Sequence, residues 1–136
     1  MISDTSTLEV IEWHDGTFES LEVRVRSCIL AFASVYVYRK LEPERFSVDS
    51  CRATLSVVGV VELHLEGALE EAGWISDCEI EGESSSDNVQ HLLSGMEARS
   101  VHMTFTNGSK LEIRCERIKL ELLGEFEPFE TWEGPL

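Results

Sequence analysis

The chain has 136 residues, of which 43% are hydrophobic, 8% aromatic and 27% charged. This composition excludes collagenous, coiled-coil and disordered chains, and the length suits a single ordinary hydrophobic core. The 26 Asp and Glu residues outnumber the 11 Lys and Arg residues, and the formal net charge is −15. Because nucleic acids and anionic membranes are both bound through positive charge, this balance argues against either as a partner.

Residues 1–7 are polar and acidic, and no basic segment leads into an apolar run, so the sequence predicts no secretory signal. The longest apolar run, Cys28–Tyr38, is roughly half as long as a membrane-spanning helix. We therefore expect a cytoplasmic protein. No C-x-x-C pair is present, which predicts reduced, core-forming thiols rather than a metal or redox site. The cysteines are Cys28, Cys51, Cys78 and Cys115.

Apolar and polar residues alternate with a period of two in the first third of the chain, which is typical of β-strands. The Asp15-Gly16 pair predicts a two-residue hairpin turn that sets Trp13 opposite Phe18. A three-residue loop there would place a glutamate opposite Leu21, so we reject it. The apolar run Ile29–Tyr38 then predicts a strand that is buried on both faces.

The middle of the chain continues this pattern. Odd-numbered positions are mostly apolar from Cys51 to Glu66, with Gly59 the expected site of a bend or bulge. Another strand is predicted from Trp74 to Glu81. Helical periodicity is confined to short stretches, and the two predicted helices are Ala68–Ala72 and Asp87–Leu93.

Val101–Phe105 and Leu111–Leu122 form the last predicted strands. Between them, a three-residue loop that ends on a left-handed Gly108 would pair Met103 with Leu111 and Val101 with Ile113. A two-residue loop would instead set Met103 against a glutamate, so we predict the longer loop.

The apolar parity changes near Glu116-Arg117, which predicts a one-residue β-bulge in the last strand. A succession of strands without β-α-β repeats favours a mainly β fold. We expect an antiparallel β-sandwich or a strongly curved antiparallel sheet, with one or two short helices. Residues 1–123 would form this single domain, and residues 124–136 an acidic-aromatic tail packed on it.

The tail carries three aromatic residues, Phe126, Phe129 and Trp132, among glutamates. Pro128 and Pro135 argue against a regular central strand. We expect the aromatic rings to fold back over one end of the core, because in water they would form an exposed apolar patch. The alternatives are a short acidic-aromatic ligand and a homodimer contact, which would make the chain a self-associating structural protein.

Negative charge is concentrated between Arg52 and Arg99, where no Lys or Arg occurs. Alternate residues of a strand point the same way, so acidic rows on two neighbouring strands would lie side by side. Such a surface would steer a basic protein partner towards it, although many acidic stretches are merely solvated. The predicted partner-binding residues are Glu62, Glu66, Asp77, Glu79, Glu81 and Glu83.

Catalytic motifs are absent from the sequence, and no cofactor is expected. The adjacent His14 and Asp15 are interpreted as turn residues. A metal site at Glu62, His64 and Glu66 is disfavoured, because residues about 6–7 Å apart along a strand converge poorly on ligand bonds near 2 Å. The competing hypothesis is a small-ligand binder or enzyme, with His14, His64 or His102 beside a carboxylate in a pocket.

The segment Trp13-His14-Asp15-Gly16, followed by Phe18 and the alternating Leu21, Val23 and Val25, resembles the opening of a group of small bacterial β-rich proteins. In that group a His-Asp turn precedes the first long strand, and some members are immunity proteins of polymorphic toxin systems. The group often has another small residue where this chain has Gly16. The resemblance implies a non-enzymatic protein that occludes another protein, which agrees with the predicted acidic docking face.

Overall fold

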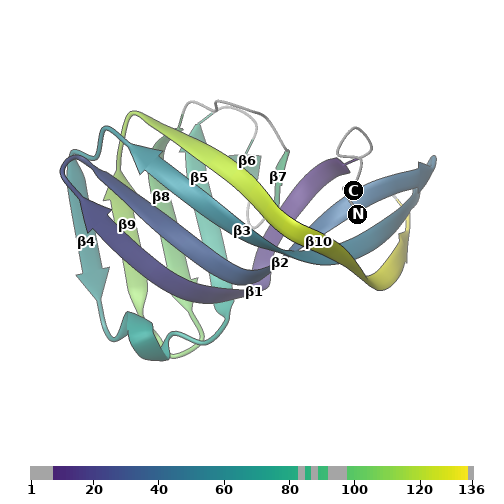
Figure 1. The fold of residues 1–136 in the computed structure, drawn as a ribbon, viewed down its shortest axis with the longest axis horizontal. Helices are drawn as coiled ribbons and strands as arrows, with labels where there is room; N and C mark the ends of the chain where they lie inside the picture. Colours follow the sequence, from purple (N-terminus) through teal and green to yellow (C-terminus); the bar gives the residue numbers. More distant parts are fainter. Residues whose placement is uncertain (1–7, 83–84, 87–88, 92–97, 135–136) are drawn as a thin grey trace.

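The computed structural model describes residues 8–82, 85–86, 89–91 and 98–134, and most of them lie in β-strands (Figure 1). Every strand pair in these ranges is antiparallel, which confirms the predicted mainly β fold. The elements are β1 (Leu8–Arg24), β2 (Ser27–Glu42), β3 (Arg45–Val58), β4 (Glu62–Glu66), the 3-10 helix η2 (Leu69–Glu71), β5 (Ile75–Gly82), β6 (Ser85–Ser86), β7 (Val89–His91), β8 (Ala98–Phe105), β9 (Lys110–Arg114) and β10 (Arg117–Glu133).

The strands form two sheets. The long sheet has the order β10-β3-β2-β1-β7-β6, and the short sheet has the order β4-β9-β8-β5. Figure 1 shows the long strands running across the short sheet and continuing well beyond it. The hydrophobic core lies between the sheets, where Leu30 and Leu55 of the long sheet and Val101 and Ile113 of the short sheet are fully buried. Within the described residues, no helix has the length and apolar character needed to cross a membrane.

The loop between β8 and β9 has the predicted register. Met103 pairs with Leu111 and Val101 with Ile113, and Gly108 has a φ of 88°. The register could be predicted because a three-residue loop is the choice that places these four apolar side chains on the buried face of the short sheet.

The predicted hairpin at Asp15-Gly16 is wrong, because β1 continues through this dipeptide. Its register against β2 slips between Glu12 and Thr17, so the dipeptide belongs to a bulge. The chain reverses later, at Val25-Arg26, where Arg26 has a φ of 58°.

Packing around the bulge explains the choice of residues there. Asp15 has a φ of 66°, which is a left-handed conformation that aspartate tolerates. A Cβ atom on Gly16 would lie 3.0 Å from the carbonyl oxygen of Trp13 and 3.2 Å from that of Ser34. The dipeptide therefore has a special conformation, as expected, but it bends one strand instead of joining two. The predicted pairing of Trp13 with Phe18 is accordingly also wrong.

Two chain crossings join the sheets at one end of the molecule, here called the crossing end. β3 leaves the long sheet at Gly59, which confirms the predicted bend, and the chain enters β4 of the short sheet. The second crossing runs from β9 to β10 through Glu116. The β-bulge predicted near Glu116-Arg117 is therefore wrong, because the chain changes sheets there. A strand that changes sheets presents a new face to the core, so its apolar parity shifts as it would at a bulge. Hydrogen bonds from Glu116 N to Val58 O (3.1 Å) and from Val61 N to Arg114 O (2.8 Å) fix the two crossings.

Of the two predicted helices, the first corresponds to the short 3-10 helix η2, which is followed by Gly73 with a φ of 71°. The second is wrong where it can be compared, because Val89–His91 form strand β7 and pair with residues 10–12 of β1. Pairing with the edge of β1 overrides the weak local helical pattern. Residues 87, 88, 92 and 93 lie outside the described residues.

The C-terminal segment up to Glu133 continues β10 along the edge of the long sheet. Its proline, Pro128, is accommodated on this edge strand beside a register slip. Phe126 packs against the core, and the Phe129 ring lies 4.9 Å from that of Tyr36. Trp132 is paired by register with Phe46 of β3. The three tail aromatics thus line the strand, and Phe129 remains 60% exposed.

All four cysteines are buried and free, as predicted for core thiols. Burial raises the pKa of Cys28 and of Cys51 to about 11, and it also raises the pKa of Cys78. These thiols are therefore protonated and chemically inert near neutral pH.

Candidate functional site

The outer face of the short sheet is the surface that carries the predicted site. On β9 the residues alternate strictly: Leu111 and Ile113 are buried, whereas Lys110, Glu112 and Arg114 are exposed. Residues paired across antiparallel strands point to the same side of the sheet, so the exposed side chains form cross-strand rows. The rows are Glu62-Arg114-Ser100, His64-Glu112-His102-Glu79 and Glu66-Lys110-Thr104-Asp77, in which Ser100 is a buried member.

This register puts four predicted partner-binding residues on one face, namely Glu62, Glu66, Asp77 and Glu79. The backbone of Glu81, two residues beyond Glu79 on β5, pairs with that of Ser100, and Glu83 lies outside the described residues. The acidic rows share this face, but they are not side by side.

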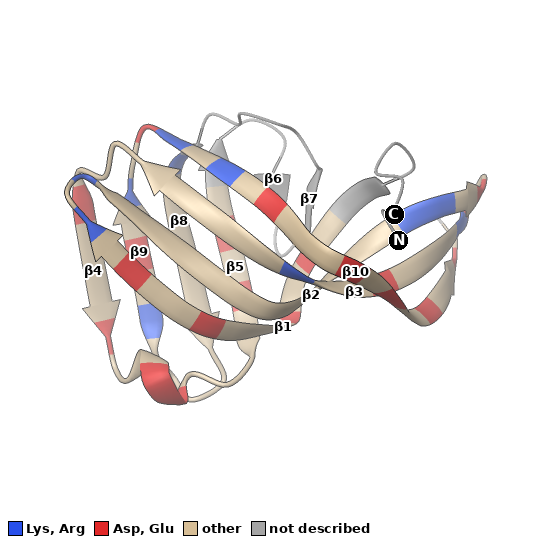
Figure 2. Ribbon diagram, in the orientation of Figure 1, with Lys and Arg blue, Asp and Glu red and all other residues tan. Residues whose placement is uncertain are grey.

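The two acidic strands are the opposite edges of the short sheet, with β9 and β8 between them. Figure 2 shows acidic positions on β4 and β5, and positions of both signs on β9. β4 and β5 follow one another in the chain, which favoured their placement as neighbours. Lys110, Glu112 and Arg114 were not predicted as part of this face, although their period-two spacing between apolar residues is visible in the sequence.

One ion pair, between Glu62 and Arg114, neutralises part of this face, and two histidines lie beside carboxylates. Glu62 lies 2.8 Å from His64 Nε2 and 3.5 Å from Arg114 Nη1, and His102 Nδ1 lies 3.6 Å from Glu112. These side chains are solvent-exposed, so each pair contributes little to stability. By contrast, no cation in the described part of the chain lies within 4.0 Å of the carboxylates of Glu66 or Glu79. Both margins of the face thus keep an uncompensated negative charge.

The same face has a hollow of about 170 Å³ between β4, β9 and β8. It brings together two histidines and two carboxylates, which are the groups that acid-base chemistry or small-ligand binding would use. Among the residues that the structure describes, no group of His, Cys, Asp and Glu is arranged to hold a metal ion. The lining residues are Glu62, His64, Ser100, His102, Glu112, Ile113 and Arg114.

The third predicted histidine, His14, lies on β1 of the other sheet. Its Nδ1 atom is 3.4 Å from Asp15 Oδ2, and both side chains are largely exposed. The two residues therefore do approach one another, but they stand apart from the histidines of the hollow.

No protein-family model, curated protein or solved structure matches the chain. Its function is therefore inferred from the geometry and charge of the described residues.

Proposed function

We propose that the chain is a cytoplasmic, non-enzymatic protein-binding domain that docks a basic protein partner, in the manner of an immunity protein. The observation that carries this proposal is the charge of the outer face of the short sheet. Its described carboxylates outnumber its cations, Lys110 and Arg114, within a chain of net charge −15. These carboxylates are Glu62, Glu66, Asp77, Glu79 and Glu112.

The position of the uncompensated charges favours recognition of an extended basic surface over a single cation. Glu66 and Glu79 stand on opposite edge strands of the sheet, and the strands between them carry His102, Glu112 and Arg114, which is paired with Glu62. A partner that covers the four strands would meet both carboxylates at once. Because exposed charges act over about 8 Å at physiological salt, they would mainly accelerate association.

The edge strand β4 offers an unpaired edge next to the acidic face. Leu65 is 47% exposed at this edge, and because it pairs with the buried Leu111 it lies on the opposite side of the sheet from His64 and Glu66. No strand in the described ranges pairs with the outer edge of β4. A protein partner could therefore bury an apolar side chain there, which supplies the lasting contact that exposed charges alone do not provide.

Affinity capture from the source cell tests this proposal when it is done with matched charge variants. The double variant Glu66→Lys/Glu79→Lys changes the outer face, whereas Glu42→Lys/Glu121→Lys makes the same change in net charge on exposed positions of the long sheet. We expect wild type and the control to retain a basic protein that elutes as salt is raised, and the first variant to lose it. Equal retention by both variants would refute the proposal.

A second candidate function is supported by the hollow that contains His64 and His102. It would bind a small polar ligand. The test is to record the imidazole NMR resonances of the protein before and after addition of the small-molecule fraction of an extract from the source cell. A ligand should shift the resonances of His64 and His102 but leave His14 unchanged. Unchanged spectra would eliminate this candidate.

A further inference from the structure

The crossing end of this acidic protein gathers positive charge. Arg24 ends β1, Arg26 lies in the following turn, and Arg99, Arg114 and Arg117 lie at the ends of β8, β9 and β10. Figure 2 shows basic positions, with acidic ones among them, where the chain passes between the sheets. The two arginines on the short sheet, Arg99 and Arg114, border a single hollow.

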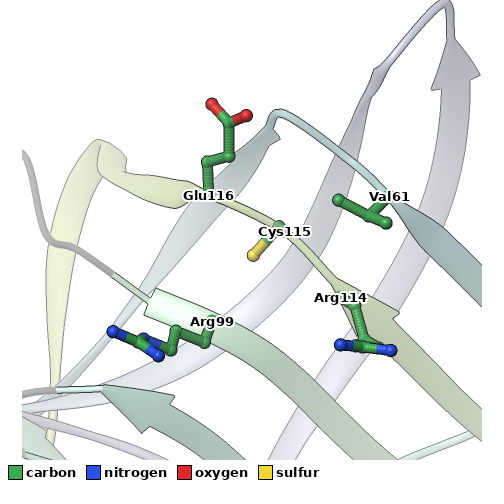
Figure 3. A pocket seen from close by; sticks show the side chains of 5 residues that line it. All are labelled: Val61, Arg99, Arg114, Cys115 and Glu116. Atoms are coloured by element: carbon green, nitrogen blue, oxygen red, sulfur yellow. The ribbon is translucent and has the colours of Figure 1, made fainter.

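This hollow has a volume of about 430 Å³ and is lined by Val61, Arg99, Arg114, Cys115 and Glu116 (Figure 3). Backbone hydrogen bonds hold its walls in place. Cys115 N donates to Arg99 O at 2.9 Å, and Val61 N donates to Arg114 O at 2.8 Å. The two arginines are thus anchored on either side of Cys115, although their side chains reach solvent.

The carboxylate that lines the hollow is turned away from both arginines. Figure 3 shows Glu116 and the Cys115 sulfur on opposite sides of the chain, with the arginines on the side of the sulfur. The Glu116 side chain lies over Gly59, where an added Cβ atom would come within 2.5 Å of its Cδ. Its Oε1 atom is 4.0 Å from Arg26 Nη2. A glycine at position 59 therefore makes room for Glu116 outside the arginine side of the hollow.

Nothing else described at this site neutralises Arg99. No carboxylate of the described residues lies within 4.0 Å of its guanidinium, and the partner of Arg114, Glu62, is an exposed carboxylate at 3.5 Å. Cys115 adds no negative charge, because burial raises the pKa of its thiol. Among the described residues, the hollow thus presents one guanidinium, that of Arg99, with no carboxylate within 4.0 Å, and a second, that of Arg114, paired with the exposed Glu62.

We propose that this hollow binds a small organic anion, with the anionic group held by Arg99 and with Arg114 at the border of the hollow. Guanidinium groups form charge-assisted hydrogen bonds with carboxylates and phosphates, and their planar geometry suits both. Val61 is 71% exposed at the rim and offers an apolar contact for the rest of the ligand. This site shares Arg114 with the outer face of the short sheet, whereas Val61, Arg99, Cys115 and Glu116 lie outside the acidic rows of that face.

The test is a titration of the intact protein followed through its arginine side-chain N–H resonances, at a salt concentration of about 0.15 M so that distant carboxylates are screened. The probes are inorganic phosphate, phenyl phosphate, acetate and benzoate. We expect saturable shifts of the Arg99 and Arg114 signals with one shared Kd. Phenyl phosphate and benzoate should bind more tightly than inorganic phosphate and acetate. The ratio of the Kd values of phenyl phosphate and benzoate identifies the preferred anionic group.

Matched variants locate the site. Arg99→Gln should weaken binding about tenfold, as expected for the loss of a charge-assisted hydrogen bond. Arg52→Gln removes an exposed arginine of β3 with the same change in net charge and should leave the Kd unchanged. Should Arg99→Gln fail to fold, Arg114→Gln gives the same reading. Shifts that grow linearly without saturation, or equal effects of Arg99→Gln and Arg52→Gln, would overturn the proposal.

Discussion

The bulge at Gly16 gives a prediction whose sign depends on the packing described here. An alanine in an unconstrained glycine position usually stabilises a protein by about 0.4–1 kcal/mol, because it restricts the unfolded chain. At position 16 the added Cβ atom would lie 3.0 Å and 3.2 Å from two backbone carbonyl oxygens. These oxygens belong to Trp13 and Ser34, in two paired strands of the long sheet, so neither can move without disturbing its neighbours.

Overpacking of this kind costs about 1–3 kcal/mol, and the entropic gain offsets part of it. Gly16→Ala should therefore destabilise the protein by about 1–2 kcal/mol, which corresponds to a fall in Tm of several degrees for a domain of this size. Urea unfolding followed by tryptophan fluorescence and circular dichroism measures this change. The neighbouring variant Asp15→Gly is the control, because it relieves a positive φ of 66° without adding an atom. Its stability should stay close to that of wild type. A Gly16→Ala protein more stable than wild type would refute the packing argument.

Two further predictions concern the core and the cysteines. Ile113→Ala, at a fully buried position between the sheets, should cost about 2–5 kcal/mol in urea unfolding, whereas Phe129→Ala, at a position that is 60% exposed, should cost clearly less; equal losses would contradict the assigned core. Burial raises the pKa of Cys28 and Cys51 from 9.0 to about 11, so the folded state keeps protons that the unfolded state releases. Their contribution to stability should be complete below pH 9 and should be lost as the pH rises towards 11. The double variant Cys28→Ala/Cys51→Ala should show a flatter decline in urea midpoint over this range, and an unchanged slope would argue against buried neutral thiols.

Local signals in the sequence were sufficient where one choice of register buried every apolar side chain. The loop ending at Gly108 is such a case, because only the longer loop placed Met103 and Leu111 on the same face. The Asp15-Gly16 dipeptide carried the same type of turn signal, yet it forms a bulge. What decides there is the close approach of Ser34 from β2, which is a contact between distant segments and has no local signature.

The parity change near Glu116 shows a second limit of sequence reasoning. A bulge and a change of sheet both reverse which residues face the core, so the pattern alone could not separate them. The acidic face shows a third. The alternation of Glu62 and Glu66, and of Asp77 and Glu79, correctly predicted that each row shares a face, because facing depends on strand geometry alone. The order of the strands depends on long-range pairing, and it placed β9 and β8 between the two rows.

The most direct test of the proposed docking face is the association rate of the captured basic protein with the two matched charge variants, measured by stopped-flow at low and at physiological salt. Electrostatic steering changes association rates by a factor of about 10 or more. We predict that Glu66→Lys/Glu79→Lys slows association about tenfold at low salt and flattens its salt dependence, while Glu42→Lys/Glu121→Lys has a much smaller effect. Equal slowing by both variants would show that only the net charge of the protein matters, and it would contradict a docking role for the outer face of the short sheet.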